Sequence, residues 1–262
     1  MYEFIEVDDP RPAVRRITLN RPEKRNAINN GMRTELFDAL ETADVDDAVH
    51  VTIVRGSGPC FSAGYDLKAT GEPKPYYTAG GDGSWSRHVT DGWFRIWDLA
   101  KPVIAQVHGY AMAGGTELVA ACDLVYVAHD ATFSYPVVRV ISPPDFQYHP
   151  WLVGMRNAME LVLMGDPISG DDAVRIGLAN RAFPADELDE RVLALAERLA
   201  GVPAALLQIN KRSVHRAMEV MGIRTALRSG SELQALASSL PEVRALLAGD
   251  PLSRVKGAAS SE

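Results

Sequence analysis

The segment from Val103 to Tyr126 constrains the fold of this chain more than any other stretch. A β-branched run, Val103–Val107, ends at the turn His108-Gly109 and predicts a buried strand. Gly114-Gly115 follow, and the apolar residues after them are too punctuated to form another strand. A strand, a tight turn and a helix start leave several backbone N–H groups unpaired, and these can hold an anion or a developing oxyanion.

Glu117 lies three residues into this predicted helix start, close to those N–H donors. A carboxylate beside oxyanion donors is a candidate general acid or base. A glycine-rich turn with a capping glutamate would have the same local sequence. Partners elsewhere in the chain therefore decide between the two interpretations.

The composition is that of an ordinary soluble globular protein. The 262 residues are 47% hydrophobic and 23% charged, and they can bury a substantial core. The net charge of −7, without a basic stripe, argues against a nucleic-acid surface. Two cysteines fit a reducing compartment, and neither a signal peptide nor an apolar run of roughly 20 residues is present. We therefore expect a cytoplasmic protein that binds neither nucleic acid nor membrane.

Predicted strands and helices alternate along the chain, which indicates an α/β fold. Strands are predicted over residues 15–20, 49–54, 103–107 and 124–128. Helices are predicted from Asn29-Asn30 onward, over 93–99 and 151–164, and between a capping box at Ser169 and a stop at Gly177.

Other segments have weaker patterns. Residues 70–90 are rich in Gly, Pro, Tyr and Ser and predict an irregular loop that can act as a lid. Residues 132–141 are β-rich. From Ala185 onward the chain is predicted to be helical, and the last twenty or so residues show little pattern. Periodicity alone does not separate a doubly wound sheet from a spiral of ββα units.

Five segments are informative together: Leu19–Ala27, Phe61–Leu67, His108–Glu117, Asp123–Ala128 and Gly170–Asn180. In this order, they resemble the crotonase family, the enoyl-CoA hydratase/isomerase superfamily. The resemblance covers most of the chain and implies a crotonase-like spiral of ββα units with a helical C-terminal extension. Residues 1–200 would form the acyl-CoA-binding core, and residues 201–262 a helical trimerisation region.

The same resemblance implies the ligands and the assembly. The substrates would be acyl-CoA thioesters, with CoA as part of the substrate, no separate cofactor and no metal. The protein would be a homotrimer or a hexamer built as a dimer of trimers.

The resemblance assigns an oxyanion hole to the backbone N–H groups of Tyr65 and Gly114. Removing a proton next to a thioester, or adding water across a conjugated one, puts negative charge on the carbonyl oxygen. Loss of one preorganised donor can cost ~3 kcal/mol. Because the Tyr65 donor is main chain, we expect substitution of its side chain to have little effect. Gly114 must be small so that the thioester can approach.

The resemblance also places the CoA moiety along two short segments, mainly through backbone groups. The residues are Arg25, Asn26, Ala27, Ala63, Asp66 and Leu67. Arg25 and its neighbour Lys24 either meet the phosphates, which we favour, or belong to a solvated turn. Asp66 either contacts CoA or caps its own turn.

Val137 is the main departure from the family pattern. Glu117 corresponds to the first catalytic glutamate of the hydratases, and the second should follow a proline in the strand after the central helix. Val137 follows Pro136 there, and valine cannot carry a proton. Asp145 stands where dienoyl-CoA isomerases have a base and an aryl-CoA dehalogenase a nucleophile, so it is the candidate second catalytic group. An aspartate after a proline pair is equally suited to a helix N-cap.

Other aromatic and nucleophilic residues have lesser expected roles. Candidates for lining the acyl pocket are Trp85, His88, Trp93 and Trp97. Tyr148 and His149 rank below Asp145 as site residues, and His108 is expected to be structural. Cys60 and Cys122 are expected to be small buried residues.

We therefore expect an acyl-CoA enzyme of the enoyl-CoA hydratase/isomerase type, with Glu117 as the acid/base. Hydration, isomerisation, hydrolysis and retro-Claisen ring cleavage all stay open. Isomerisation needs only one shuttling base, whereas hydrolysis would recruit Asp145 or a histidine. The missing second glutamate also leaves the alternative of a non-catalytic acyl-CoA-binding homologue or an oligomeric scaffold.

Overall fold

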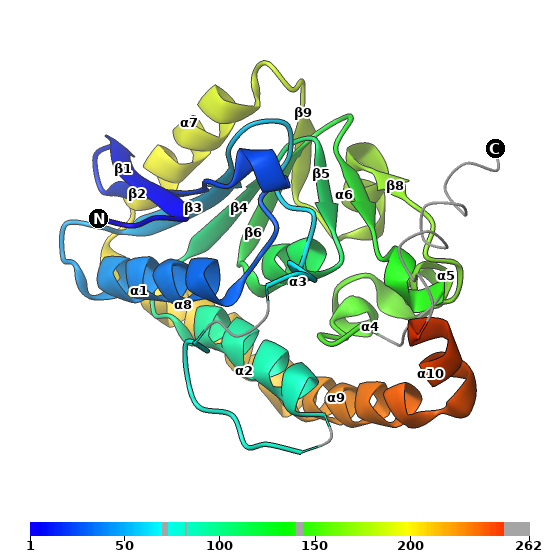
Figure 1. The fold of residues 1–262 in the computed structure, drawn as a ribbon. Helices are drawn as coiled ribbons and strands as arrows, with labels where there is room; N and C mark the ends of the chain where they lie inside the picture. Colours follow the sequence, from blue (N-terminus) through cyan, green and yellow to red (C-terminus); the bar gives the residue numbers. More distant parts are fainter. Residues whose placement is uncertain (70–72, 82, 140–143, 249–262) are drawn as a thin grey trace.

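A six-stranded sheet forms the centre of the molecule (Figure 1). The computed structural model describes residues 1–69, 73–81, 83–139 and 144–248. The strand order is β1-β2-β3-β4-β6-β9. The strands are β1 (Ile5–Arg11), β2 (Val14–Leu19), β3 (Val51–Gly56), β4 (Val103–Val107), β6 (Leu124–Ala128) and β9 (Arg181–Phe183). β1 and β2 form an antiparallel hairpin, and the remaining neighbours pair in parallel.

Helices cover both faces of this sheet, which explains why all five residues of β4 are buried. α1 (Asn30–Val45) packs on β1 and β2, and α7 (Leu188–Ala200) packs across β1 to β6 on the opposite face (Figure 1). The Asn29 side chain accepts a hydrogen bond of 2.8 Å from the Met32 N–H and caps α1, as predicted.

A second, three-stranded sheet carries the site. It consists of β5 (Tyr110–Met112), β7 (Thr132–Ser134) and β8 (Ile168–Ser169), in the order β5-β7-β8. β4 matches the predicted strand over Val103–Val107, and α3 (Gly114–Ala121) begins at the predicted helix start, so both are confirmed. β5 was not predicted, because three residues are too few to show a strand pattern.

Two sequence predictions are wrong. Residues 84–90 belong to α2 (Ser84–Asp98) rather than to a loop, since Val89 and Trp93 bury one face of this helix. The β-rich stretch after Thr132 ends at Ser134 and turns into a 3₁₀ helix, η2 (Pro136–Arg139). Val137 therefore lies in η2 and not in a strand. Residues 70–72, 82 and 140–143 lie outside the described residues.

The remaining elements are mostly helical. They are η1 (Pro22–Lys24), α4 (His149–Leu152), α5 (Gly154–Met164), α6 (Gly170–Ile176), α8 (Ala204–Val220), α9 (Ile223–Ser239) and α10 (Pro241–Leu247). The predicted helix over 151–164 is split, because Gly154 has φ +74°. Ser169 caps α6 through the Asp172 N–H, as predicted. α9 runs along α2 (Figure 1), so the C-terminal helices pack on the core. The final fourteen positions, 249–262, lie outside the described residues.

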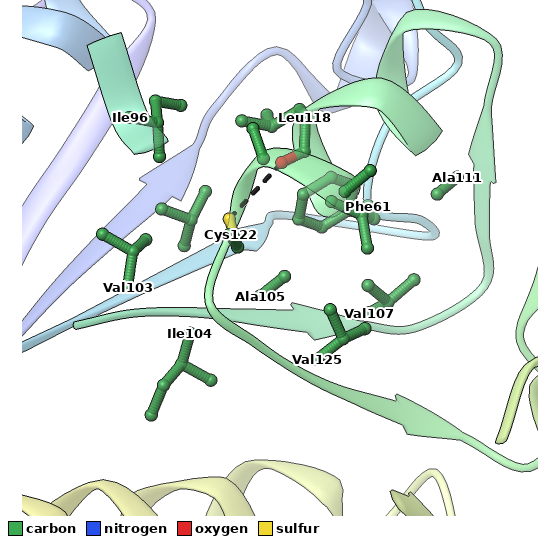
Figure 2. Close-up of a cluster of buried hydrophobic side chains, with 14 of the residues drawn as sticks. Phe61, Ile96, Val103, Ile104, Ala105, Val107, Ala111, Leu118, Cys122 and Val125 are labelled. Atoms are coloured by element: carbon green, nitrogen blue, oxygen red, sulfur yellow. Dashed lines mark hydrogen bonds between the residues drawn. The ribbon is translucent and has the colours of Figure 1, made fainter. Parts of the chain in front are cut away.

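The core between α3 and the large sheet is filled by aliphatic and aromatic side chains (Figure 2). Phe61 and Leu118 lie there with β4 residues such as Val107, and all three side chains are fully buried. Cys60 and Cys122 are free and buried, as predicted.

No single described helix has the length and apolar content to cross a membrane. Only α7 and α8 taken together meet that criterion, and they are bent by 103° where they join.

Candidate active site

The turn between β5 and α3 has a strained backbone. Ala113 has φ 46° and ψ −115°, which is rare for a residue with a side chain. Its N–H donates to the Ser134 carbonyl at 3.0 Å, and its carbonyl accepts hydrogen bonds from the N–H groups of Thr116 and Glu117. The turn is thereby fixed, and α3 begins at Gly114.

The segment around Tyr65 lies against this helix start. A β-carbon on Gly64, which has φ +87°, would lie 3.1 Å from the Gly114 nitrogen. A β-carbon on Gly114 would lie 2.6 Å from Cε2 of Tyr65, so only glycine fits beneath that ring. Within the described residues, the backbone N–H groups of Tyr65 and Gly114 donate to no protein acceptor. The structure therefore brings both predicted oxyanion donors to adjoining segments, with their N–H groups available.

Glu117 is fully buried on the first turn of α3, and four donors hold its carboxylate. Oε2 accepts hydrogen bonds from the Tyr65 hydroxyl at 2.5 Å and from Trp93 Nε1 at 3.3 Å. Oε1 accepts hydrogen bonds from the Tyr135 hydroxyl and, at 3.2 Å, from the Phe146 N–H. The carboxyl group is thus fixed in orientation by groups from four separate segments.

Burial and hydrogen bonding act on the pKa of Glu117 in opposite directions. Burial raises this pKa, and the bonds from Tyr135, Tyr65, Phe146 and Trp93 offset part of the rise because they favour the charged form. Burial, with the nearby Glu117 charge, also raises the pKa values of Tyr65 and Tyr135 well above their usual range. Both phenols therefore stay protonated and remain donors.

Asp145 lies beside Glu117, since the next residue, Phe146, donates its N–H to the Glu117 carboxylate. Its side chain is buried and accepts a 3.1 Å hydrogen bond from the Ser86 hydroxyl. Burial, together with the charge of Glu117, raises the pKa of Asp145 to about 7. The N-cap interpretation is wrong, because the next helix, α4, begins at His149 with Tyr148 as its N-cap.

The C-terminal helix α9 reaches this carboxyl group through α2. The Ser86 hydroxyl lies within hydrogen-bond distance of both Gln234 of α9 and Asp145. The Thr90 hydroxyl donates to the Asp145 carbonyl at 3.1 Å and lies 2.9 Å from the Ser231 hydroxyl of α9. Two residues of the predicted trimerisation region thus support the surroundings of Asp145.

Three of the four predicted pocket aromatics gather near Glu117. Trp93 donates to the Tyr65 hydroxyl at 3.0 Å, and Trp85 packs edge-on against the Tyr65 ring with centroids 5.2 Å apart. His88 lies 6.1 Å from the Trp85 ring. Trp97 does not belong to this group, because it stacks on His215 of α8 at 4.0 Å.

The family assignment rests on the sequence. Residues 10–240 match the family described as enoyl-CoA hydratase/isomerase. The chain belongs to the enoyl-CoA hydratase/isomerase family.

Relatives and solved structures agree with this. EchA13 of Mycobacterium tuberculosis, which carries the name of an enoyl-CoA hydratase, is 37% identical over 249 residues, covering 86% of this chain and 78% of that protein. The 2,3-dehydroadipyl-CoA hydratase of Escherichia coli is 33% identical over 207 residues, covering 78% and 79%. A crystal structure of an enoyl-CoA hydratase/isomerase from Xanthobacter autotrophicus Py2 superposes with a TM-score of 0.87 at 33% identity, covering 100% and 98%. The predicted crotonase fold with its helical C-terminal region is thus confirmed.

The residues predicted to bind CoA differ in exposure and in the hydrogen bonds that they already make. Asn26 is fully buried, and its side chain bonds the Arg21 N–H and the carbonyls of Ser57 and Cys60. Its backbone N–H donates to the Arg21 carbonyl and its own carbonyl accepts from the Ser62 hydroxyl, so each polar group of Asn26 already has a partner within the protein. Asp66 caps its own turn through the Lys68 N–H at 3.0 Å and pairs with Arg21 at 3.1 Å.

The other CoA candidates lie on the same surface. The Arg25 carbonyl accepts from the Ala63 N–H at 2.9 Å, which joins the two predicted segments. Arg25 and Leu67 are exposed, and Ala27 is half-buried. Five of the six residues therefore reach one surface region, Asn26 is buried beneath it, and the exposed Arg25 side chain is an available contact.

His108, Tyr148 and His149, which were ranked below Asp145 or expected to be structural, pack within the protein. His108 Nε2 lies 2.9 Å from the Gly58 carbonyl, as expected of a structural histidine. His149 is buried against Tyr148 with ring centroids 4.2 Å apart, and burial lowers its pKa to about 4. His149 is therefore neutral near pH 7. Within the described ranges, no group of three or more His, Cys, Asp or Glu side chains is placed to hold a metal ion.

Two residues in and beside the site, Tyr135 and Arg33, were not predicted from the sequence. The Tyr135 hydroxyl bonds Glu117, although the strands β6 and β7 separate the two residues along the chain and no local pattern marks Tyr135. Arg33 is buried on α1, and here a signal existed: positions 33, 36, 37 and 40 share one helix face, and the other three are core residues.

Proposed function

We propose that this protein adds water reversibly across the conjugated double bond of an enoyl-CoA thioester. Glu117 and Asp145 are the two proton-carrying groups in this proposal. The observation that carries it is the juxtaposition of a fully buried carboxylate, held by four hydrogen bonds, with two backbone N–H groups that have no described acceptor, one at the start of α3 and one on the adjoining segment at Tyr65.

In this proposal, the N–H groups of Tyr65 and Gly114 hold the thioester oxygen. As water adds to the β-carbon, negative charge moves onto that oxygen, and the two donors stabilise the enolate. Ionised Glu117 accepts the proton that the water gives up. Asp145, with a pKa of about 7, is partly protonated at neutral pH and returns a proton to the α-carbon. Asp145 thereby takes the role of the second catalytic glutamate, whose position is occupied by Val137.

Double-bond isomerisation is the second candidate, and two observations favour it. Val137 leaves Glu117 without the expected glutamate partner, and the four donors on Glu117 occupy both of its oxygens. A single base that moves one proton between two carbons needs no water in the site.

Turnover of enoyl-CoA thioesters in ¹⁸O-labelled water distinguishes these reactions. Hydration places the label in a β-hydroxyl group, whereas isomerisation moves the double bond without incorporating ¹⁸O. We expect label incorporation by the wild-type protein and its loss in both Glu117→Gln and Asp145→Asn. Tight acyl-CoA binding without turnover on the whole panel would instead support the non-catalytic homologue.

The CoA moiety is proposed to lie over Arg25, Asn26, Ala27, Ala63, Asp66 and Leu67. The exposed Arg25 guanidinium, with the exposed Lys24 ammonium beside it, would meet the phosphates. Substitution of Arg25 by Ala is therefore expected to raise KM and leave kcat nearly unchanged.

Residues 201–262 are proposed to make the trimer contacts, with the core in residues 1–200. α8 and α9 expose large apolar side chains that a trimer would cover: Leu206, Ile209, Val214, Leu233 and Leu236. Sedimentation equilibrium of the full chain tests whether it is a trimer or a hexamer.

A further inference from the structure

Arg33 is a buried cation without a carboxylate partner. Its side chain on α1 is only 1% exposed. Nη2 donates to the Tyr76 hydroxyl at 3.0 Å and to the His88 carbonyl at 3.1 Å, both of which are neutral acceptors. Nε and Nη1 have no hydrogen-bond partner among the described residues. No described Asp or Glu forms an ion pair with this guanidinium.

Such an arrangement is costly unless something else interacts with the charge. A buried charge usually needs a partner of opposite sign or a full set of hydrogen bonds. The rings of Phe37, Tyr76 and Trp93 lie 5.3–5.9 Å from the guanidinium carbon and provide cation–π attraction. They leave the N–H groups on two of its three nitrogens unsatisfied. Arg33 therefore retains the capacity to bind an anion.

Arg33 lies next to the candidate active site. The guanidinium stands 5.3 Å from the Trp93 ring, and the indole N–H of the same tryptophan donates to Glu117. Trp93 thus separates the base from the cation. Arg33 is therefore one aromatic side chain away from Glu117.

His88 adds a second unpartnered polar atom to this region. It is fully buried on α2, its ring lies 4.6 Å from the Tyr76 ring, and its Nε2 has no partner among the described residues. Burial lowers the pKa of His88 to about 3, so the imidazole is neutral. Two polar side chains therefore lie beside the Tyr76 ring: the positively charged Arg33 and the neutral His88.

We propose that Arg33 binds a carboxylate at the far end of the acyl group, so that the preferred substrates are enoyl-CoA thioesters of dicarboxylic acids. This inference rests on the proposed function and names its substrate class. A substrate carboxylate supplies the opposite charge that the protein does not, and an alkyl chain end would leave the buried cation unpaired.

The test compares kcat/KM for two enoyl-CoA series of matched chain length, one ending in a carboxylate and the other in a methyl group. The wild-type protein is expected to favour the carboxylate series. Arg33→Met keeps the side-chain volume and removes the charge, and the preference ratio should fall roughly 10- to 100-fold, as expected for loss of a charge-assisted hydrogen bond. Arg33→Lys should retain part of the preference.

Arg95→Met is the matched control. Arg95 also lies over the Phe37 and Tyr76 rings, but it is partly exposed and pairs with Glu41. Its substitution should leave the preference ratio unchanged.

Three outcomes have distinct meanings. A wild-type protein that turns over the methyl series as well as or better than the carboxylate series overturns the inference without any variant. Equal loss on both series in a folded Arg33→Met protein also overturns it, since Arg33 then acts only in packing. Absence of turnover on both series by the wild-type protein contradicts the proposed function itself.

Discussion

The hydroxyl of Tyr65 donates a hydrogen bond of 2.5 Å to Oε2 of Glu117, while the backbone N–H of the same residue has no acceptor among the described residues. One residue thus serves the site twice, through its main chain toward the thioester and through its side chain toward the base. The expectation that the Tyr65 side chain matters little is therefore replaced by the opposite prediction.

Tyr65→Phe keeps the main-chain donor and removes the bond to Glu117. We expect kcat/KM to fall about tenfold, since one hydrogen bond to a charged group is lost. That bond lowers the pKa of Glu117, so its removal raises the pKa. If Glu117 acts as a base, the ascending limb of the pH–rate profile moves to higher pH. Tyr77→Phe, at an exposed tyrosine, is the control, and an unmoved limb in Tyr65→Phe would contradict the assigned role.

Asp145→Asn is expected to change the pH dependence of stability. The pKa of Asp145 is about 7 in the folded chain, above the ~3.9 of an unfolded aspartate, so folding favours the protonated form. Wild-type stability should therefore fall as the pH rises between these values, and the loss is complete above about pH 7.

The asparagine variant lacks this titration. Its free energy of unfolding, relative to wild type, should rise by up to ~4 kcal/mol from acidic to mildly alkaline pH. Urea unfolding at several pH values measures the difference, with the exposed Asp130→Asn as control. A constant difference would show that Asp145 is not the group that titrates.

Gly114→Ala should abolish turnover by steric displacement. The added methyl group would lie 2.6 Å from the Tyr65 ring, which must then move away from both Gly114 and Glu117. We expect a fall in kcat of at least ~100-fold, comparable with loss of an oxyanion donor. Gly80→Ala is the control, because nothing lies within 4 Å of a β-carbon there. Normal kcat in Gly114→Ala would contradict the proposed position of the thioester.

Asn26→Ala should destabilise the fold. The side chain is fully buried and makes three hydrogen bonds, and the backbone φ of 53° suits asparagine better than alanine. We expect the free energy of unfolding to fall by roughly 2–4 kcal/mol. Denaturant unfolding provides the measurement, with the exposed Asn210→Ala on α8 for comparison. A loss of acyl-CoA affinity without a change in stability would instead indicate direct contact of the side chain with the ligand.

Elements with strong local signals were predictable from the sequence. Residues within a few positions determine three of these features: the β-branched run of β4, the Asn29 cap of α1 and the Ser169 cap of α6. The first seven residues of α2 were not predictable in this way. Their buried face includes Ser86, His88 and Thr90, whose polarity resembles a loop until tertiary partners are known.

The candidate site was predictable only in part. Glu117 and Gly114 belong to one local motif, and Tyr65 followed from a resemblance to a family. The bond between Tyr65 and Glu117 joins residues 52 positions apart, and no local pattern reports it. The two interpretations of Asp145 depended on its surroundings, which the sequence near it does not contain.

The attachment of α9 to Asp145 has a thermodynamic consequence. Ser231 and Gln234 of α9 bond to the same α2 hydroxyls that hold Asp145, so the acid strength of Asp145 depends on where α9 sits. Linkage is reciprocal, and protonation of Asp145 must therefore bias the position of α9 by the same free energy. Any molecule that docks on the outer face of α9 and shifts this helix becomes an effector of the proton chemistry, without touching the substrate.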